Sequence, residues 1–207
     1  MTTNSWKGLS LVLAVALTAC SAEERDPGQV AQAAAADQAA GNQPESPVKA
    51  EFVIALDGEG LRFVNAETGS TSLLAFGVDR STTDGAIAEH LGKADERSSN
   101  QECGAGPMEF THYGAFSGNF QEDRFVGWSL RDGDRQAPLT TMSGIRIGTK
   151  RSEMSESVVF DIYEDSSIGT EFRVSGDEPG GFSGLFENET PDARITDLWA
   201  GTSCIFR

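Results

Sequence analysis

After residue 50, large apolar residues alternate with small or polar ones in several short runs. This two-residue period predicts antiparallel strands that bury one face. In one run, for example, Val126, Trp128 and Leu130 fall on the same side of the predicted strand. The predicted strands are Leu61 to Val64, Ser72 to Phe76, a strand around Phe110, Phe116 to Phe120, Phe125 to Leu130, Glu171 to Val174, Gly181 to Phe186 and Arg194 to Ala200.

Two helices are predicted between these strands. Ser81-Thr82-Thr83-Asp84 offers N-cap residues followed by an acid, and Gly92 stands where a helix C-cap is expected. A second helix is expected after Thr149, through Met154 to Val158.

The two halves of this region share motifs in the same order, which predicts a tandem duplication. The shared motifs are Gly77 with Arg80-Ser81 and Gly148 with Arg151-Ser152; Glu109-Phe110 and Glu171-Phe172; Phe116-Ser117-Gly118-Asn119-Phe120 and Phe182-Ser183-Gly184-Leu185-Phe186; and Trp128 and Trp199. We therefore expect an α+β fold, in which a helix plus an antiparallel meander occurs twice and the helices pack on one face of the sheet. Residues 51–207 would be one domain, with a flanking hairpin (51–76) and repeat units at about 77–135 and 139–207.

This organisation resembles the tandem-repeat β-lactamase-inhibitor-like fold, and also the small lipoproteins that serve outer-membrane assembly. Gly77 to Ser81, before the first helix, and His90 to Gly92, at its end, carry the resemblance. It extends over roughly residues 75 to 204 and implies binding of other proteins through an open sheet face. The resemblance assigns no inhibitory or assembly role to any single residue of this sequence.

The first twenty residues predict export. Lys7 precedes an apolar run from Leu9 to Leu17, which is too short to span a membrane. Leu17-Thr18-Ala19-Cys20 resembles the lipobox of bacterial lipoproteins, so residues 1–19 would be the signal peptide and Cys20 the lipidated N-terminus. Ser21, in place of the aspartate that retains family members at the inner membrane, implies an outer-membrane anchor facing the periplasm. The alternative is an ordinary secretory signal with an incidental cysteine.

The stretch from residue 20 to 50 is rich in alanine, glutamine and proline and has no aromatic residue. Such a composition predicts a disordered tether that holds the domain away from the membrane. The whole chain has a net charge of −16, of which the domain carries about −14. This acidity argues against nucleic acid as a partner, because phosphates must be neutralised by clustered basic residues.

Cys103 and Cys204 are the two cysteines that remain after Cys20. In an oxidising periplasm they predict one disulfide across a loop of about 100 residues. A reactive thiol is the alternative, although neither cysteine has a CxxC context.

Known catalytic motifs are missing. Gly181-Phe182-Ser183-Gly184 departs from the GxSxG motif at Leu185, and no phosphate-binding or dinucleotide-binding glycine motif occurs, so no nucleotide or other cofactor is expected. Two histidines are too few for a multi-histidine metal site. His90 is expected at the end of a helix, and His112 in a short strand where no sequence-near aspartate or cysteine completes a ligand set.

These observations predict a non-enzymatic, lipid-anchored module of the cell envelope that binds another protein. The candidate surface consists of Trp128, Trp199, Phe116 and Phe182. One alternative is an envelope hydrolase whose site assembles from distant residues, with His112 or His90 beside an acid. The other, suggested by the fold resemblance alone, is a protein inhibitor of a hydrolase.

Overall fold

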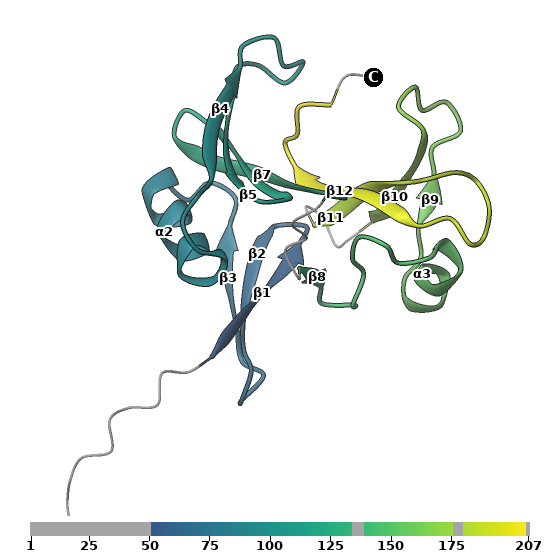
Figure 1. Cartoon of the computed structure of the whole chain (residues 1–207), viewed down its shortest axis with the longest axis horizontal. Coiled ribbons are helices and arrows are strands. Elements are labelled where there is room, and N and C mark those ends of the chain that lie inside the picture. The colour runs from purple at the N-terminus through teal and green to yellow at the C-terminus, as the bar shows by residue number, and fades with distance from the viewer. Residues whose placement is uncertain (1–50, 134–138, 176–179, 206–207) are drawn as a thin grey trace, which may run out of the picture. The chain divides into compact units, whose positions relative to one another are not determined.

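The computed structural model describes residues 51–133, 139–175 and 180–205 (Figure 1). These residues belong to the compact unit 49–207, which is separate in its contacts from residues 1–48. The predicted signal peptide, Cys20 and the predicted tether up to residue 50 lie outside the described residues.

Strands are the main secondary structure of the described residues, and they form two sheets. The large sheet has eight strands in the order β4-β5-β6-β7-β12-β11-β10-β9, and every neighbouring pair is antiparallel. Its strands are β4 (Glu96–Asn100), β5 (Met108–Tyr113), β6 (Phe116–Gln121), β7 (Arg124–Arg131), β9 (Asp161–Ile162), β10 (Thr170–Ser175), β11 (Gly181–Phe186) and β12 (Ile195–Gly201). The two segments with the FSGxF pattern are β6 and β11, which lie on either side of the central pair β7 and β12.

The small sheet has the order β3-β2-β1-β8. Its strands are β1 (Phe52–Asp57), β2 (Gly60–Asn65), β3 (Thr71–Ala75) and β8 (Thr140–Thr141). The first three form an antiparallel meander, and β8 returns from the middle of the chain to pair with β1 in parallel. The segment predicted as a flanking hairpin is therefore most of a second sheet.

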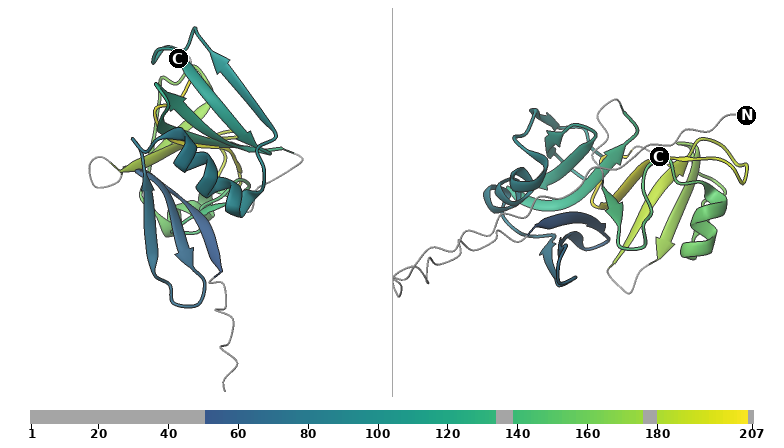
Figure 2. Two further views of the ribbon diagram at one scale, coloured as in Figure 1. Left: turned by 90° about the vertical axis from the view of Figure 1, so that its left-hand side faces the viewer. Right: turned by 60° about the horizontal axis from the view of Figure 1, so that its bottom comes forward.

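The predicted α+β class, with helices packed on one face of a single sheet, is wrong. The described residues are mostly β-structure, with the two helices α2 (Arg80–Leu91) and α3 (Arg151–Ser157). The small sheet lies under the middle of the large sheet, and the helices lie on either side of it (Figures 1 and 2). The physical reason is that each helix has little to bury: α2 buries Thr83 and Ile87, and α3 buries Met154.

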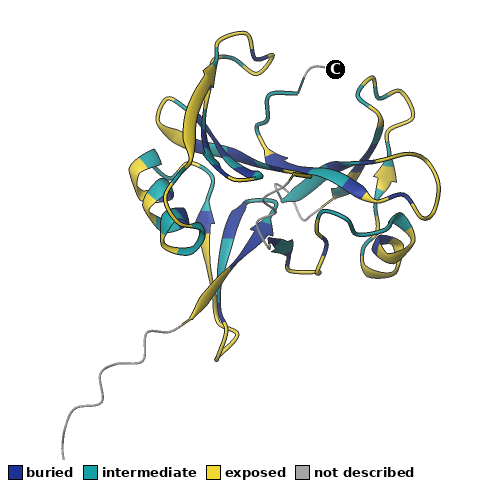
Figure 3. Ribbon diagram, in the orientation of Figure 1, coloured by how far each residue is buried: buried dark blue, intermediate teal, exposed yellow. Residues whose placement is uncertain are grey.

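The core lies between the two sheets, where the ribbon is dark in Figure 3. Leu56, Leu61 and Leu74 of the small sheet belong to the same buried cluster as Trp128. The Trp128 indole nitrogen donates a hydrogen bond to the Asp57 carbonyl oxygen at 2.8 Å. This bond satisfies the polar atom of a fully buried ring and fixes the β1–β2 hairpin against β7.

The alternation of residues in the central strands explains which face is buried. Along one transverse row of the large sheet, Phe116 pairs with Leu130, Leu130 with Leu198, and Leu198 with Gly184. All of these residues are buried toward the small sheet. In the register of β6 and β7, Trp128 lies opposite Gly118.

The N-cap of helix α2 lies two residues before Ser81, the first of the predicted cap residues. Asp79 is the N-cap, and its carboxylate accepts a hydrogen bond from the Thr82 backbone N–H at 2.9 Å. The prediction of Ser81 to Asp84 as cap residues is corrected accordingly, whereas the predicted C-cap at Gly92, with φ of 84°, is confirmed.

Asp84 attaches α2 to the large sheet. Its carboxylate lies 2.8 Å from the Arg97 guanidinium on β4 and accepts a hydrogen bond from the Tyr113 hydroxyl of β5 at 3.2 Å. Burial and then the charge of Asp84 raise the pKa of Tyr113 above its usual value, because both favour the neutral phenol. The helix is therefore positioned by polar contacts as well as by Ile87.

Candidate functional site

The face of the large sheet opposite the small sheet contains a groove of about 860 Å³. It extends over β4, β5, β6, β7, β12 and β11, so strands from both halves of the domain contribute to it. A volume of this size is typical of ligand sites in proteins.

The floor of the groove comes from the row of residues next to the buried row. Across the sheet, His112 pairs with Ser117, Ser117 with Ser129, Ser129 with Trp199, and Trp199 with Ser183. A shift of one residue along each strand thus exchanges leucines and phenylalanines for serines, because side chains alternate between faces. Ser117, Ser129 and Trp199 line the groove, together with the apolar side chains of Phe110, Leu185 and Ile205.

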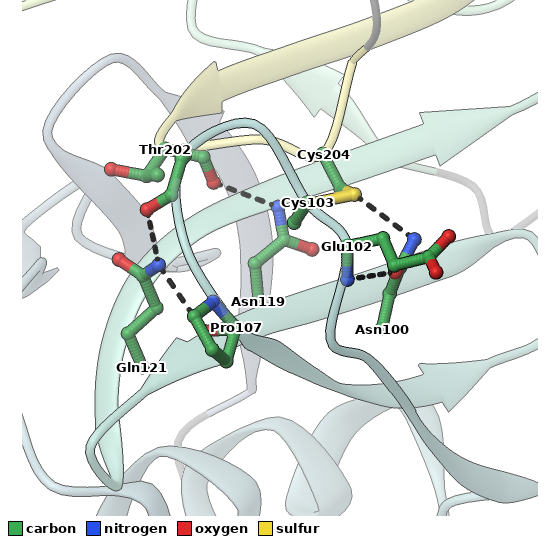
Figure 4. The surroundings of a disulfide bond; sticks show 9 residues. Asn100, Glu102, Cys103, Pro107, Asn119, Gln121, Thr202 and Cys204 are labelled. Atoms are coloured by element: carbon green, nitrogen blue, oxygen red, sulfur yellow. Dashed lines mark hydrogen bonds between the residues drawn. A yellow bond between two sulfur atoms is a disulfide. The ribbon is translucent and has the colours of Figure 1, made fainter.

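The C-terminal segment forms one wall of the groove. After β12 the chain turns back, and Ser203, Cys204 and Ile205 line the groove beside Trp199. Cys204 forms the disulfide with Cys103 that the sequence predicts, which confirms the pairing. The bond joins the C-terminal segment to the loop between β4 and β5 (Figure 4).

Hydrogen bonds hold both sides of this disulfide (Figure 4). The Asn119 amide donates to the Thr202 carbonyl oxygen at 3.0 Å, and the Thr202 backbone N–H donates to the Val126 carbonyl oxygen at 2.7 Å. On the loop side, the Gln121 amide donates to the carbonyl oxygen of Ala105 at 2.8 Å. The wall is therefore fixed to the sheet at several points.

His112 lies in the groove between two serines. Its Nε2 atom is 2.8 Å from the Ser98 hydroxyl, and its Nδ1 atom is 2.7 Å from the Ser117 hydroxyl. The three side chains come from three neighbouring strands, β4, β5 and β6. A histidine that bridges two hydroxyls can accept a proton from one while donating its own N–H to the other.

Sequence analysis missed Ser98 and Ser117 as partners of His112. The signal for Ser117 was present, because the two-residue turn Gly114-Ala115 joins β5 to β6 and places His112 opposite Ser117. Ser98 had no such signal, since its register depends on the longer loop around Cys103.

The four aromatic residues predicted to form an interaction surface do not lie on one surface. Trp128 and Phe116 are fully buried in the core and present no surface, which corrects the expectation that they form an interaction surface. Trp199 is 7% exposed and lies in the groove. Phe182 is half-buried and lines a separate hollow with Tyr163 and Arg173.

His90 lies away from the groove. It is in the last turn of α2, and its ring centroid is 5.0 Å from that of Phe63 on β2. The described residues contain no group of three or more histidine, cysteine, aspartate or glutamate side chains that could hold a metal ion. None of the helices in this part of the chain is long and apolar enough to cross a membrane.

No family model, curated protein or solved structure matches the chain. These comparisons add no support to the inhibitor function, which depended on the fold resemblance alone. The groove itself is therefore the feature that bears on function.

Proposed function

We propose that this chain is a lipid-anchored binding module of the bacterial cell envelope, and that the groove binds a segment of a protein partner. The observation that carries the proposal is the groove on the face of the large sheet opposite the small sheet. Its half-buried apolar side chains, Phe110 and Leu185, lie beside hydroxyl and amide groups. This mixture suits a partner that buries apolar side chains and also forms hydrogen bonds.

The lipid anchor is supported by the lipobox at Cys20 and by the tether that follows it. Metabolic labelling with a radioactive fatty acid tests this part. The wild-type protein should incorporate the label and the Cys20→Ser variant should not. Equal labelling of both proteins would show that Cys20 is not the attachment site.

Photo-crosslinking in intact cells tests the groove. A benzoylphenylalanine residue replaces Phe110, which lines the groove, or Val159, which is 89% exposed and lies outside it. We expect a discrete protein adduct from position 110 and none from position 159. Adducts from position 159 alone, or none from position 110, would contradict the proposed binding surface.

A hydrolase is the second candidate function. The observation that favours it is that His112 lies within hydrogen-bond distance of both Ser98 and Ser117. In ester hydrolysis, Ser98 Oγ would attack the carbonyl carbon and pass its proton to His112 Nε2. His112 would return that proton to the leaving alcohol, and water would then release the acyl group from Ser98. Ser117 would orient the imidazole by accepting the Nδ1 hydrogen.

Labelling with a fluorophosphonate probe tests this second candidate. Ser98→Ala should abolish labelling, whereas Ser99→Ala should retain it, because Ser99 lies on the other face of β4. Absence of labelling in the wild-type protein would remove the hydrolase from consideration and leave the binding module unaffected.

A further inference from the structure

A second pocket, of about 810 Å³, lies beside the segment that joins β8 to α3. The end of β7, the segment from Ser143 to Thr149, helix α3 and the residue before β12 contribute to it. In Figure 1 this segment lies on the side of the large sheet that carries the small sheet, away from the C-terminal segment that borders the groove. The pocket therefore differs from the groove in position, although Leu130 and Arg131 at the end of β7 line both.

The charge of this pocket is opposite to that of the domain. Arg131, Arg146 and Arg194 line it, and Glu153 is the one acid among its described lining residues. The Glu153 carboxylate already accepts a hydrogen bond from the Lys150 backbone N–H at 3.2 Å. Arg131 is paired with Asp197 at 3.7 Å, so Arg146 and Arg194 supply the local positive potential of this pocket, in a domain with a net charge of about −14.

Two of these arginines retain hydrogen-bonding capacity. Arg146 forms no salt bridge with the described residues, and its side chain makes no hydrogen bond with them. Arg194 donates from Nη1 to the Gly148 carbonyl oxygen at 2.8 Å and has no salt bridge within the described ranges. A guanidinium carries five N–H donors, so most of the donors on both side chains are available to a ligand.

The backbone around the pocket is held in place. Gly148 N–H donates to the Ile195 carbonyl oxygen at 2.8 Å, and Ile195 N–H donates to the Thr149 carbonyl oxygen at 3.0 Å. The Thr149 hydroxyl accepts a hydrogen bond from the Arg146 backbone N–H at 3.1 Å, which leaves its own hydrogen free to donate. The segment thus presents guanidinium and hydroxyl donors from a fixed loop.

We propose that this pocket binds a phosphoryl group carried by a small molecule or a lipid headgroup. Guanidinium groups form paired, charge-assisted hydrogen bonds with phosphate oxygens. A phosphate ester with two negative charges can bind more than one arginine, whereas a carboxylate carries a single negative charge. The pocket is larger than a free phosphate ion, so an esterified phosphate fits it better. This inference does not depend on the function proposed for the groove.

Calorimetric titration of the full-length protein in non-ionic detergent with glycerol 3-phosphate tests the proposal. Arg146→Ala should weaken binding about tenfold, as expected for loss of a charge-assisted contact. This substitution removes no side-chain hydrogen bond or salt bridge to the described residues. Arg173→Ala is the matched control, because Arg173 is an exposed arginine outside the pocket and should bind as the wild-type protein does.

Repetition of the titration in detergent mixed with phosphatidylglycerol identifies the source of the phosphate. If phosphatidylglycerol weakens the apparent binding of glycerol 3-phosphate to the wild-type protein but not to Arg146→Ala, the pocket binds lipid headgroups. Unchanged binding would assign it to soluble phosphate esters. The proposal would be overturned by absence of binding in the wild-type protein, or by an equal loss with Arg146→Ala and Arg173→Ala.

Discussion

Removal of the disulfide between Cys103 and Cys204 should lower the free energy of unfolding substantially. The two cysteines are 101 residues apart in sequence, so the bond closes a long loop in the unfolded chain. The chain-entropy model gives about 4.7 kcal/mol for a loop of this length, and measured losses for native disulfides are typically about 2–5 kcal/mol. The Cys103→Ser/Cys204→Ser double variant avoids leaving a single free thiol at this site.

Urea unfolding followed by tryptophan fluorescence measures this loss. Trp128 is in the core and Trp199 is in the groove, so the signal reports both regions. The double variant should shift the midpoint to lower urea, and reductant should shift the wild-type protein in the same way without affecting the variant. A loss below about 1 kcal/mol would refute the argument that the bond stabilises by constraining the unfolded chain.

Three other substitutions are predicted to change stability, each measured by thermal unfolding. Gly85→Ala in α2 should stabilise the protein by about 0.5–1 kcal/mol, because a Cβ there meets no atom within 4 Å and alanine favours helix; a loss of stability would contradict this. Gly184→Ala should destabilise it by about 1–3 kcal/mol or more, because its Cβ would lie 2.3 Å from a backbone oxygen and 2.6 Å from the Phe172 ring; a neutral effect would refute the packing argument. Hydrogen bonds from the Thr82 backbone N–H, and then from the Ser81 and Thr82 hydroxyls, lower the pKa of Asp79 from 3.8 to about 2. The ionised Asp79 carboxylate therefore stabilises the folded protein above pH 3.8, and this stabilisation is lost as the pH falls toward 2. Asp79→Asn should still cap α2, and the melting temperature of the wild-type protein should fall more than that of this variant over that pH range; parallel falls would contradict the assignment.

Six of the eight strands of the large sheet, β5, β6, β7, β10, β11 and β12, could be predicted because their apolar residues follow a two-residue period, whereas β4 (Glu96–Asn100) has no apolar residue and β9 has only two residues. The FSGxF segments became β6 and β11, and the cysteine pair formed the expected disulfide. The strands depend on residues that are close in sequence, and the disulfide followed from there being a single possible pairing of the two cysteines. The small sheet could not be predicted in this way, because β8 reaches β1 from about 85 residues further along the chain.

The groove was hidden from sequence analysis for a related reason. Its floor contains Ser117 and Ser129, which are paired across β6 and β7, and serines carry no pattern of their own in a sequence. The interaction surface was instead predicted from aromatic residues of the same strands, and two of these, Phe116 and Trp128, are buried in the core on the opposite face. An error of one residue in assigning a face therefore exchanges the core for the groove.

The same alternation explains why the groove stays open in a domain with a solid core. Large residues such as Phe116, Leu130 and Trp128 fill the space between the sheets, whereas the small side chains of Ser117 and Ser129 on the other face leave space for the groove. Large side chains on the core face and small ones on the groove face thus follow from the same alternation along each strand.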